Sequence, residues 1–471
     1  MKSGLALVAV LIMSFTAVQA VAQWSSDPSL NLPLANRKNN DQVQPKVKPL
    51  PNGQWYVSWF DADPSSPAPV GYDVYYTLLS ATGVKLMAIH RGNLVADLSN
   101  SSTEDYGLDI DTDGNALLAF LDTREGSNQQ VTAVKLDKTG KRLWGTYGIQ
   151  LTSDADEHDD PKITGTTDGG AVVGWSSNGT VQLQKLDENG KKVWPKPLVL
   201  SESGFNYLMA DLHASDDGSV IVSWERDSGF FSNHQLRANK ISATGKRLWG
   251  KNNVVLFDQG SLQFGEFPRF LTDGSGGAIF DWYTNSPALQ VFAQHIRADG
   301  SEAFPHNGAA GSTDTSNVRV EPSVSYHAAT DETFLYWTEE DSLQIVNGVY
   351  GQKFNGQGVS EWGSTGLVIV PLGTDQQSFV ENVPLGTGSM VLWVDAPGYG
   401  MGTMQAAKLD GKGNVMCGPV AVSSAPANKY GLSVDITNHN LTAVAWADDR
   451  IGNNSIYIQD VQPDCTLGKK D

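Results

Sequence analysis

The chain is built from short apolar segments that contain an aromatic side chain and recur roughly every 50 residues. β-Branched and aromatic residues are common in these segments, and no helical spacing of apolar residues follows residue 22. A Gly- or Asp-containing turn precedes most copies, as in TDGG at 167–170. The eight segments are 55–61, 116–122, 171–177, 220–226, 278–284, 333–339, 390–396 and 442–448. This pattern predicts a repeated all-β unit.

Seven of the eight repeats also carry a turn glycine followed four residues later by a large residue or Cys, most clearly in the pairs Gly140/Trp144 and Gly245/Trp249. The third repeat divides into four strand-like stretches, which are 161–166, 171–175, 180–187 and 191–200. Units of four short strands repeated around an axis form a β-propeller. We therefore expect an all-β, eight-bladed β-propeller of four-stranded blades.

The two ends of the chain predict how the ring closes. The eighth repeat stops before its fourth strand, and the strand-like residues 29–35 precede the first repeat without a partner. We expect this N-terminal strand to complete the last blade, because closing the ring removes exposed sheet edges. Residues 23–471 would then form one domain.

The N-terminal 22 residues are typical of a secretory signal peptide, with one Lys, an apolar run over 5–18 and small residues at Ala20 and Ala22. We expect cleavage and export to the periplasm or the extracellular space. The 33 Lys and Arg against 52 Asp and Glu leave a net charge of −19, which disfavours nucleic acid and anionic lipid as partners. We expect a monomer, not inserted in a membrane, whose partner is a glycan or an extracellular protein.

The turn motif resembles the tryptophan-docking motif of eight-bladed quinoprotein-type propellers, most clearly in AVKLDKTGKRLW at 133–144 and ANKISATGKRLW at 238–249. The resemblance implies that each Trp packs against the turn glycine of the neighbouring blade. It is also loosely similar to the Asp-box turns of sialidase-like propellers. It does not extend to quinone chemistry, because this chain lacks the adjacent Cys–Cys pair of those dehydrogenases. We expect no redox cofactor.

Cys417 and Cys465 are the only cysteines, and two cysteines in an exported protein favour a single disulfide. Under the resemblance, Cys417 occupies the Trp position of the seventh blade and Cys465 the turn-glycine position of the eighth. The motif thus implies a bridge that replaces the aromatic contact between these blades.

The innermost strands would line a central channel, with one face packed between blades and the other facing the axis. The residues expected to face the axis are Lys46, Lys48, Asp109, Asp111, Lys162, Thr164, Asp211, His213, Arg269, Ser433 and Asp435. Such a wall suits a polar ligand, although a water-filled channel without a function would look similar.

Aromatic residues stand at similar positions before these strands, namely Tyr106, Tyr207, Phe267 and Tyr430. Rings around a polar channel mouth suit a sugar, whose C–H faces pack on them. The alternative is that these rings cover the blades. The candidate ligand-binding residues are Lys46, Lys162, Arg269, Asp435, Tyr106, Phe267 and Tyr430.

The stretch DIDTDG places Asp109, Asp111 and Asp113 at alternate positions, as in calcium-binding hairpins. Leu117 stands where the final carboxylate would be needed, and the Asp-Gly pair coincides with a hairpin turn of other repeats. A structural turn is therefore the alternative to a calcium site, and calcium is the one cofactor that the sequence suggests.

Two classes of function remain open. The first is a binding or scaffold module for a glycan or a protein at the channel mouth. The second is a polysaccharide-cleaving enzyme. A hydrolase would use Asp109 and Asp211, whereas a lyase would use His213 or Tyr207 as base, with Lys162 or Arg269 neutralising a sugar acid.

Overall fold

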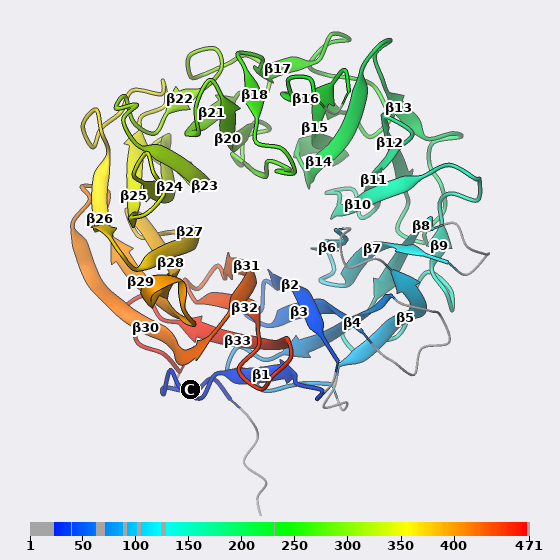
Figure 1. Ribbon diagram of the computed structural model, residues 1–471. Helices are drawn as coiled ribbons and strands as arrows, with labels where there is room; N and C mark the ends of the chain where they lie inside the picture. The colour runs from blue at the N-terminus through cyan, green and yellow to red at the C-terminus, as the bar shows by residue number, and fades with distance from the viewer. Residues whose placement is uncertain are drawn as a thin grey trace, which may run out of the picture.

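The computed structural model describes residues 23–38, 40–62, 71–87, 92–100, 105–123, 129–229 and 231–468. The expected signal peptide, residues 1–22, lies outside the described residues. The chain forms eight antiparallel sheets arranged around a central axis (Figure 1), which confirms the expected eight-bladed propeller.

The first blade comprises β2 (Gln42–Pro49), β3 (Trp55–Asp61), β4 (Tyr72–Leu79) and β5 (Asn93–Asn100), and the second comprises β6 (Gly107–Ile110), β7 (Ala116–Asp122), β8 (Gln130–Leu136) and β9 (Ile149–Gln150). The third blade comprises β10 (His158–Gly165), β11 (Ala171–Ser177), β12 (Thr180–Leu186) and β13 (Leu198–Leu200), and the fourth comprises β14 (Asn206–Ala214), β15 (Val220–Asp227), β16 (Gln235–Ile241) and β17 (Val254–Phe257).

The fifth blade comprises β18 (Ser261–Leu262), β19 (Phe270–Thr272), β20 (Ala278–Ser286), β21 (Gln290–Ile296) and β22 (Ala309–Ala310), and the sixth comprises β23 (Val318–His327), β24 (Glu332–Glu340), β25 (Asn347–Phe354) and β26 (Leu367–Gly373). The seventh blade comprises β27 (Gln376–Leu385), β28 (Gly388–Ala396), β29 (Gly402–Leu409) and β30 (Val415–Ala427), and the eighth comprises β31 (Lys429–Ile436), β32 (Thr442–Asp448), β33 (Ser455–Val461) and β1 (Leu32–Ala35). Two 3-10 turns, Asp216–Gly218 and Pro397–Tyr399, interrupt this pattern. No helix in the described part of the chain is long and apolar enough to cross a membrane.

The hydrophobic core lies between blades, because each sheet packs both of its faces against a neighbour. Tyr56 of β3 and Leu118 of β7, for example, belong to one buried cluster that joins the first and second blades. The second strand of each blade contributes one large aromatic that is at most 2% exposed: Trp59, Phe120, Trp175, Trp224, Trp282, Trp337, Trp393 and Trp446. Adjacent blades therefore stabilise one another.

The turn between the third and fourth strands of a blade also contacts the preceding blade. The Trp144 Nε1 donates a hydrogen bond to the Glu188 carbonyl of the next blade at 3.1 Å, and Trp194 Nε1 donates to Ala243 at 2.9 Å. A side-chain carbon at Gly190 would lie 2.9 Å from the Trp144 ring, and the φ of Gly190 is +82°, so both space and backbone geometry require glycine. The resemblance to quinoprotein-type repeats stays a prediction.

The N-terminal strand closes the ring, as the sequence predicted. β1 pairs antiparallel with β33 and completes the eighth sheet. The structure adds a contact that the sequence did not predict. Trp24 Nε1 donates a hydrogen bond to the Ala81 carbonyl at 2.9 Å, and the Trp24 ring lies against the turn glycine Gly83. The N-terminal segment thereby supplies the aromatic that the eighth repeat lacks.

The expected disulfide between Cys417 and Cys465 is confirmed. The Cys465 amide donates to the Gln462 carbonyl at 2.9 Å, just as the Gly190 amide donates to Asp187 in the third blade. Cys465 has a φ of +64°, so it occupies the glycine position of the turn. The bridge joins the seventh blade to the eighth where other blades use an aromatic side chain.

Candidate functional site

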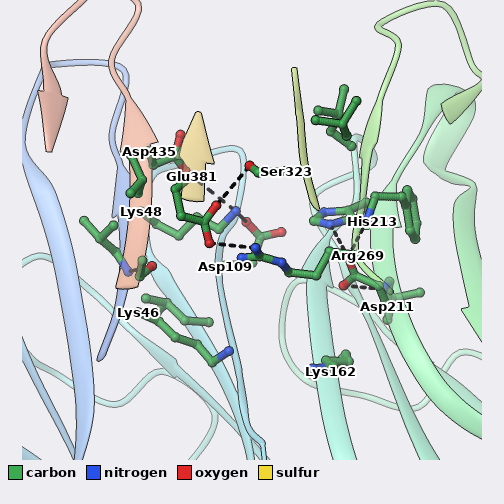
Figure 2. Close-up of a pocket in the computed structure, with 18 of the residues that line it drawn as sticks. Lys46, Lys48, Asp109, Lys162, Asp211, His213, Arg269, Ser323, Glu381 and Asp435 are labelled. Atoms are coloured by element: carbon green, nitrogen blue, oxygen red, sulfur yellow. Dashed lines mark hydrogen bonds and ion pairs between the residues drawn. The ribbon is translucent and has the colours of Figure 1, made fainter. Parts of the chain in front are cut away.

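A cavity of about 580 Å³ lies at the centre of the ring, between the innermost strands (Figure 2). Nine of the residues expected to face the axis are on its wall, namely Lys46, Lys48, Asp109, Lys162, Asp211, His213, Arg269, Ser433 and Asp435. Asp111 and Thr164 were expected to face the axis but are not on this wall. Asp111 lies in a hairpin turn, and the Thr164 hydroxyl donates to Asp109 Oδ2 at 2.8 Å.

β-Bulges orient many of these side chains. In six blades the pairing of the first two strands shifts register immediately before a wall residue; these residues are Lys46, Lys162, Asp211, Ser323, Glu381 and Ser433. The φ angle is positive within five of these bulges, at Gln44, Asp160, Glu321, Phe379 and Gly431. A bulge redirects the side chain that follows it, so these residues project toward the axis.

Each lysine of the wall has a carboxylate partner. Lys46 pairs with Asp105 at 2.8 Å, and Lys162 contacts the same carboxylate. Burial would raise the pKa of Asp105, but the two lysines hold it well below its usual range. Sequence reasoning missed Asp105 because it precedes β6, where no strand alternation marks it.

Lys48 lies between two carboxylates on opposite sides of it along the wall. Its Nζ is 4.0 Å from Asp109 and 3.9 Å from Asp435. Burial raises the pKa of Asp435, with Lys48 opposing this effect. The charges of the first, second and eighth blades are therefore largely matched to one another.

Asp109 and Asp211, the two expected catalytic carboxylates, are already occupied by protein donors. Asp109 accepts the Gly165 amide at 3.0 Å in addition to the Thr164 hydroxyl. Asp211 accepts the Phe270 amide at 3.1 Å and lies 3.0 Å from His213 Nε2. Both carboxylates link adjacent blades. Asp211 accepts contacts on both of its oxygens, whereas both hydrogen bonds to Asp109 go to Oδ2.

The pKa of Asp211 reflects these contacts. Burial alone would raise it, but His213, Lys162 and the Leu212 amide outweigh burial and hold the pKa well below its usual range. Asp211 therefore stays ionised at neutral pH.

Tyr207 is not at the channel mouth, and its expected role as a base is wrong. It is 2% exposed, its hydroxyl donates to Glu202 Oε2 at 3.1 Å and its ring packs 5.3 Å from that of Trp224. The reason is its place before the bulge of β14, where its side chain points between blades.

The other three aromatic residues differ in position. Tyr106 touches the cavity, but its ring is buried against Phe60 and its hydroxyl donates to the Gln44 carbonyl at 3.1 Å. Tyr430 is exposed but is not on the cavity wall. Phe267 is 38% exposed and lies on the wall, so it is the aromatic of this set that a ligand can reach.

The three aspartates proposed for calcium do not converge. The Asp111 carboxylate accepts the backbone amides of Asp113 and Asn115 at 2.9 and 2.8 Å, and it pairs with Lys135 at 2.6 Å. Asp109 instead faces the channel. Within the described residues, no group of three His, Cys, Asp or Glu side chains is placed to hold a metal ion. DIDTDG thus forms a hairpin turn in the structure, and calcium binding there stays a prediction.

The fifth blade departs from the symmetry of the ring. Its inner edge consists of the short β18 and β19 joined by residues 263–269, in place of one continuous inner strand. This connection carries Phe267 and Arg269 to the cavity. Arg269 is 62% exposed on its side chain and reaches Glu381 of the seventh blade at 2.6 Å (Figure 2). Among the described ion pairs of the wall, it alone joins blades that are not adjacent.

The fifth blade also places a carboxyl group on the cavity wall that interacts electrostatically with Arg269. Asp281 of β20 lies on the cavity wall and is 7% exposed. Burial, reinforced by Glu381 and Asp211 and opposed by Arg269, raises its pKa to about 8. Asp281 is therefore mostly protonated at neutral pH.

Sequence reasoning missed Asp281 and Glu381 for different reasons. Asp281 is visible in AIFDWYT as an acidic residue inside an apolar segment, a signal that could have been used. Glu381 follows the bulge of β27, and no sequence pattern marks that bulge.

No protein family profile and no curated protein sequence matches this chain. Its fold is similar to that of the α-L-arabinanase of Penicillium chrysogenum complexed with arabinobiose, at 10% identity and a TM-score of 0.40, covering 93% of this chain and 99% of that chain. It is also similar to prolyl oligopeptidase B from Galerina marginata, at 10% identity and a TM-score of 0.43, covering 88% and 56% of the two chains. A Hadza microbial sialidase matches at 12% identity and a TM-score of 0.35, covering 75% and 76%. At these values the likenesses carry no conclusion about function.

Proposed function

We propose that the protein is an exported glycan-binding propeller whose central cavity holds a neutral carbohydrate. The observation that carries this proposal is an open cavity of about 580 Å³ whose wall presents hydrogen-bond donors and acceptors together. Ligand sites typically enclose about 300–1,000 Å³. A pure scaffold would fill this space with side chains.

The charge pairing of the wall favours a neutral ligand. In the described part of the wall, Lys46 and Lys162 share Asp105, Lys48 lies between two aspartates and Arg269 pairs with Glu381. An acidic sugar would have to displace one of these partners, whereas hydroxyl groups can bond to donors and acceptors that stay paired.

Two further features support the proposal. Phe267 offers an exposed ring on the cavity wall, on which the C–H face of a sugar can pack. The leader-like residues 1–22 and the disulfide between Cys417 and Cys465 are what an exported protein would have.

The test is calorimetric titration of the purified protein, without its leader, against a panel of neutral and acidic oligosaccharides. We expect a neutral oligosaccharide to bind, and Phe267→Ala to weaken its binding about five- to tenfold through the lost ring contact. Tyr147→Ala is the matched control, because Tyr147 is an exposed aromatic outside the cavity wall. Binding of acidic sugars alone, or of none, would contradict the proposal.

Cleavage of the bound polysaccharide is the second candidate function, and the protonated Asp281 in the cavity favours it. A hydrolase fits better than a lyase. Tyr207 lies away from the cavity, and Lys162 and Arg269, which would neutralise a sugar acid, already have carboxylate partners.

A further inference from the structure

We propose that Asp281 is the general acid of a glycoside-hydrolysing centre in the fifth-blade side of the cavity, with Glu381 as the base that activates water. This inference rests on the proposed binding of a neutral carbohydrate and names two catalytic residues for the same site.

The first support is that Asp281 breaks the symmetry of the ring. It stands one residue before the buried aromatic of its second strand. The residues at this position in the other blades are Ser58, Ala119, Gly174, Ser223, Tyr336, Leu392 and Ala445. All seven are uncharged, and none of them lies on the cavity wall. Seven blades form without a carboxyl group at this position, so the repeat itself does not require one.

The second support is the irregular inner edge of the same blade. β19 has three residues, and the connection at 263–269 takes the place of the longer inner strand of most other blades. Because this inner edge is irregular, Asp281 on the second strand, β20, reaches the cavity. The same connection brings Phe267 and Arg269 to the wall, so the ring, the acid and the cation that contacts Glu381 all come from the fifth blade.

The third support is the arrangement of Glu381. Its Oε1 accepts Arg269 at 2.6 Å and its Oε2 accepts the Ser323 hydroxyl at 3.2 Å. These two contacts come from different blades and hold the carboxylate on the wall in one orientation (Figure 2). Glu381 accepts fewer protein donors than Asp211 does, which leaves lone pairs for a water molecule.

The reaction balances with water as the only co-reactant. The Asp281 carboxyl proton passes to the glycosidic oxygen as the bond from that oxygen to the anomeric carbon breaks. A water molecule attacks the anomeric carbon and gives its proton to Glu381. The products are two sugar fragments, each with a new hydroxyl group. Loss of the proton from Glu381 and its return to Asp281 through solvent restore the starting state.

Arg269 and Asp211 would act as positioning and electrostatic groups. Arg269 holds Glu381 in place, and the ionised Asp211 next to His213 would stabilise the positive charge that develops on the sugar ring. Asp211, which the sequence suggested as a catalytic carboxylate of a hydrolase, would thus act only through its charge, and Asp281 would transfer the proton.

The experiment measures cleavage and binding side by side. The protein is incubated with soluble neutral polysaccharides (starch, xylan, β-glucan, galactan and arabinan), reducing ends are quantified, and binding of the same polymers is measured by calorimetry. The variants are Asp281→Asn and Glu381→Gln. Asp410→Asn, in an exposed turn outside the cavity, is the control.

We expect Asp281→Asn to lower kcat by about 10²- to 10⁴-fold, the usual contribution of a general acid. Binding of the polymer should stay within about threefold, and Asp410→Asn should match the native protein. The native kcat should also fall above about pH 8 as Asp281 loses its proton, and a merely structural residue would not produce that limb. If Asp281→Asn does not fold, the alkaline limb and Glu381→Gln still test the proposal.

The other outcomes separate the two proposals. Binding without new reducing ends would overturn the hydrolytic centre and leave glycan binding in place. Cleavage that persists in Asp281→Asn with an unchanged pH profile would overturn the assignment of Asp281. The absence of both binding and cleavage on every polymer would overturn glycan binding and, with it, this inference.

Discussion

Asp281 is a buried carboxyl group at a position where seven other blades place an uncharged residue. Burying a carboxylate is costly. Arg269 favours the charged form of Asp281, but burial together with Glu381 and Asp211 outweighs it, so the side chain keeps its proton. The fold therefore loses stability at this residue as the pH rises, which is a common property of functional sites.

The pH dependence of stability should reveal this cost. The pKa of Asp281 is about 8 in the folded protein and about 3.9 in an unfolded chain. The folded state thus holds a proton that the unfolded state releases, and the stability contribution present below about pH 4 is lost as the pH rises to about 8. Asp281→Asn removes this loss. Its free energy of unfolding should exceed that of the native protein by a margin that grows by up to about 1.4 kcal/mol per pH unit across this window.

Urea unfolding at pH 4, 6 and 8 measures the effect. A constant difference between the two proteins at all three pH values would show that Asp281 does not retain its proton.

The turn between the third and fourth strands is the element that joins neighbouring blades. In the second to fourth blades it does so with a tryptophan over a glycine, and between the seventh and eighth blades with a disulfide. Cys417 and Cys465 occupy the positions of that Trp and Gly, and Cys465 even keeps a positive φ. The disulfide therefore takes the position of the Trp–Gly contact, although the disulfide is a covalent link.

Replacing the disulfide by a Trp–Gly pair tests whether the two kinds of contact can substitute for each other. Replacing both cysteines with serine should lower the free energy of unfolding by about 2–4 kcal/mol. Cys417→Trp with Cys465→Gly should recover about 1–3 kcal/mol of this loss, because it restores a buried aromatic and a residue that tolerates positive φ. Denaturant unfolding under non-reducing conditions compares the variants. A Trp/Gly variant no more stable than the serine variant would show that the turns are not equivalent.

At the scale of the whole molecule, the ring holds together through a segment from the other end of the chain. β1 completes the sheet of β33, and Trp24 packs on the Gly83 turn of the first blade with its side chain 5% exposed. The N-terminal segment thereby links the eighth blade to the first, and it covers the edge that β33 would otherwise expose.

Removing the ring of Trp24 should weaken this closure. Trp24→Ala is expected to lower the free energy of unfolding by about 3–5 kcal/mol, the usual cost of truncating a buried Trp. Trp24→Phe keeps an aromatic ring and loses the hydrogen bond to Ala81 and part of the buried ring area. It should therefore lower the free energy of unfolding by less than the Ala variant does, about 1–2 kcal/mol. Thermal unfolding gives the stabilities, and faster amide exchange in β33 should accompany the Ala variant. Equal stability of the Ala and Phe variants would contradict a closure held by the ring.

The sequence by itself determined the architecture. The apolar segments, the turn glycines and the unpaired residues 29–35 predicted eight blades and their closure, and the aligned positions of Cys417 and Cys465 predicted the disulfide. These features are local and repeat along the chain, and strand periodicity and turn chemistry depend only on near neighbours.

Only the tertiary structure decided the candidate site. The similar position of Tyr207 before the inner strand placed it at the channel mouth. Tyr207 instead lies within β14, before its bulge, and the structure buries its ring between blades. The pairing of Arg269 with Glu381 joins residues 112 positions apart from non-adjacent blades, and the proton on Asp281 depends on burial among such groups. Contacts of this kind arise only when the ring closes, because the ion pairs of Lys46, Lys48 and Arg269 join different blades.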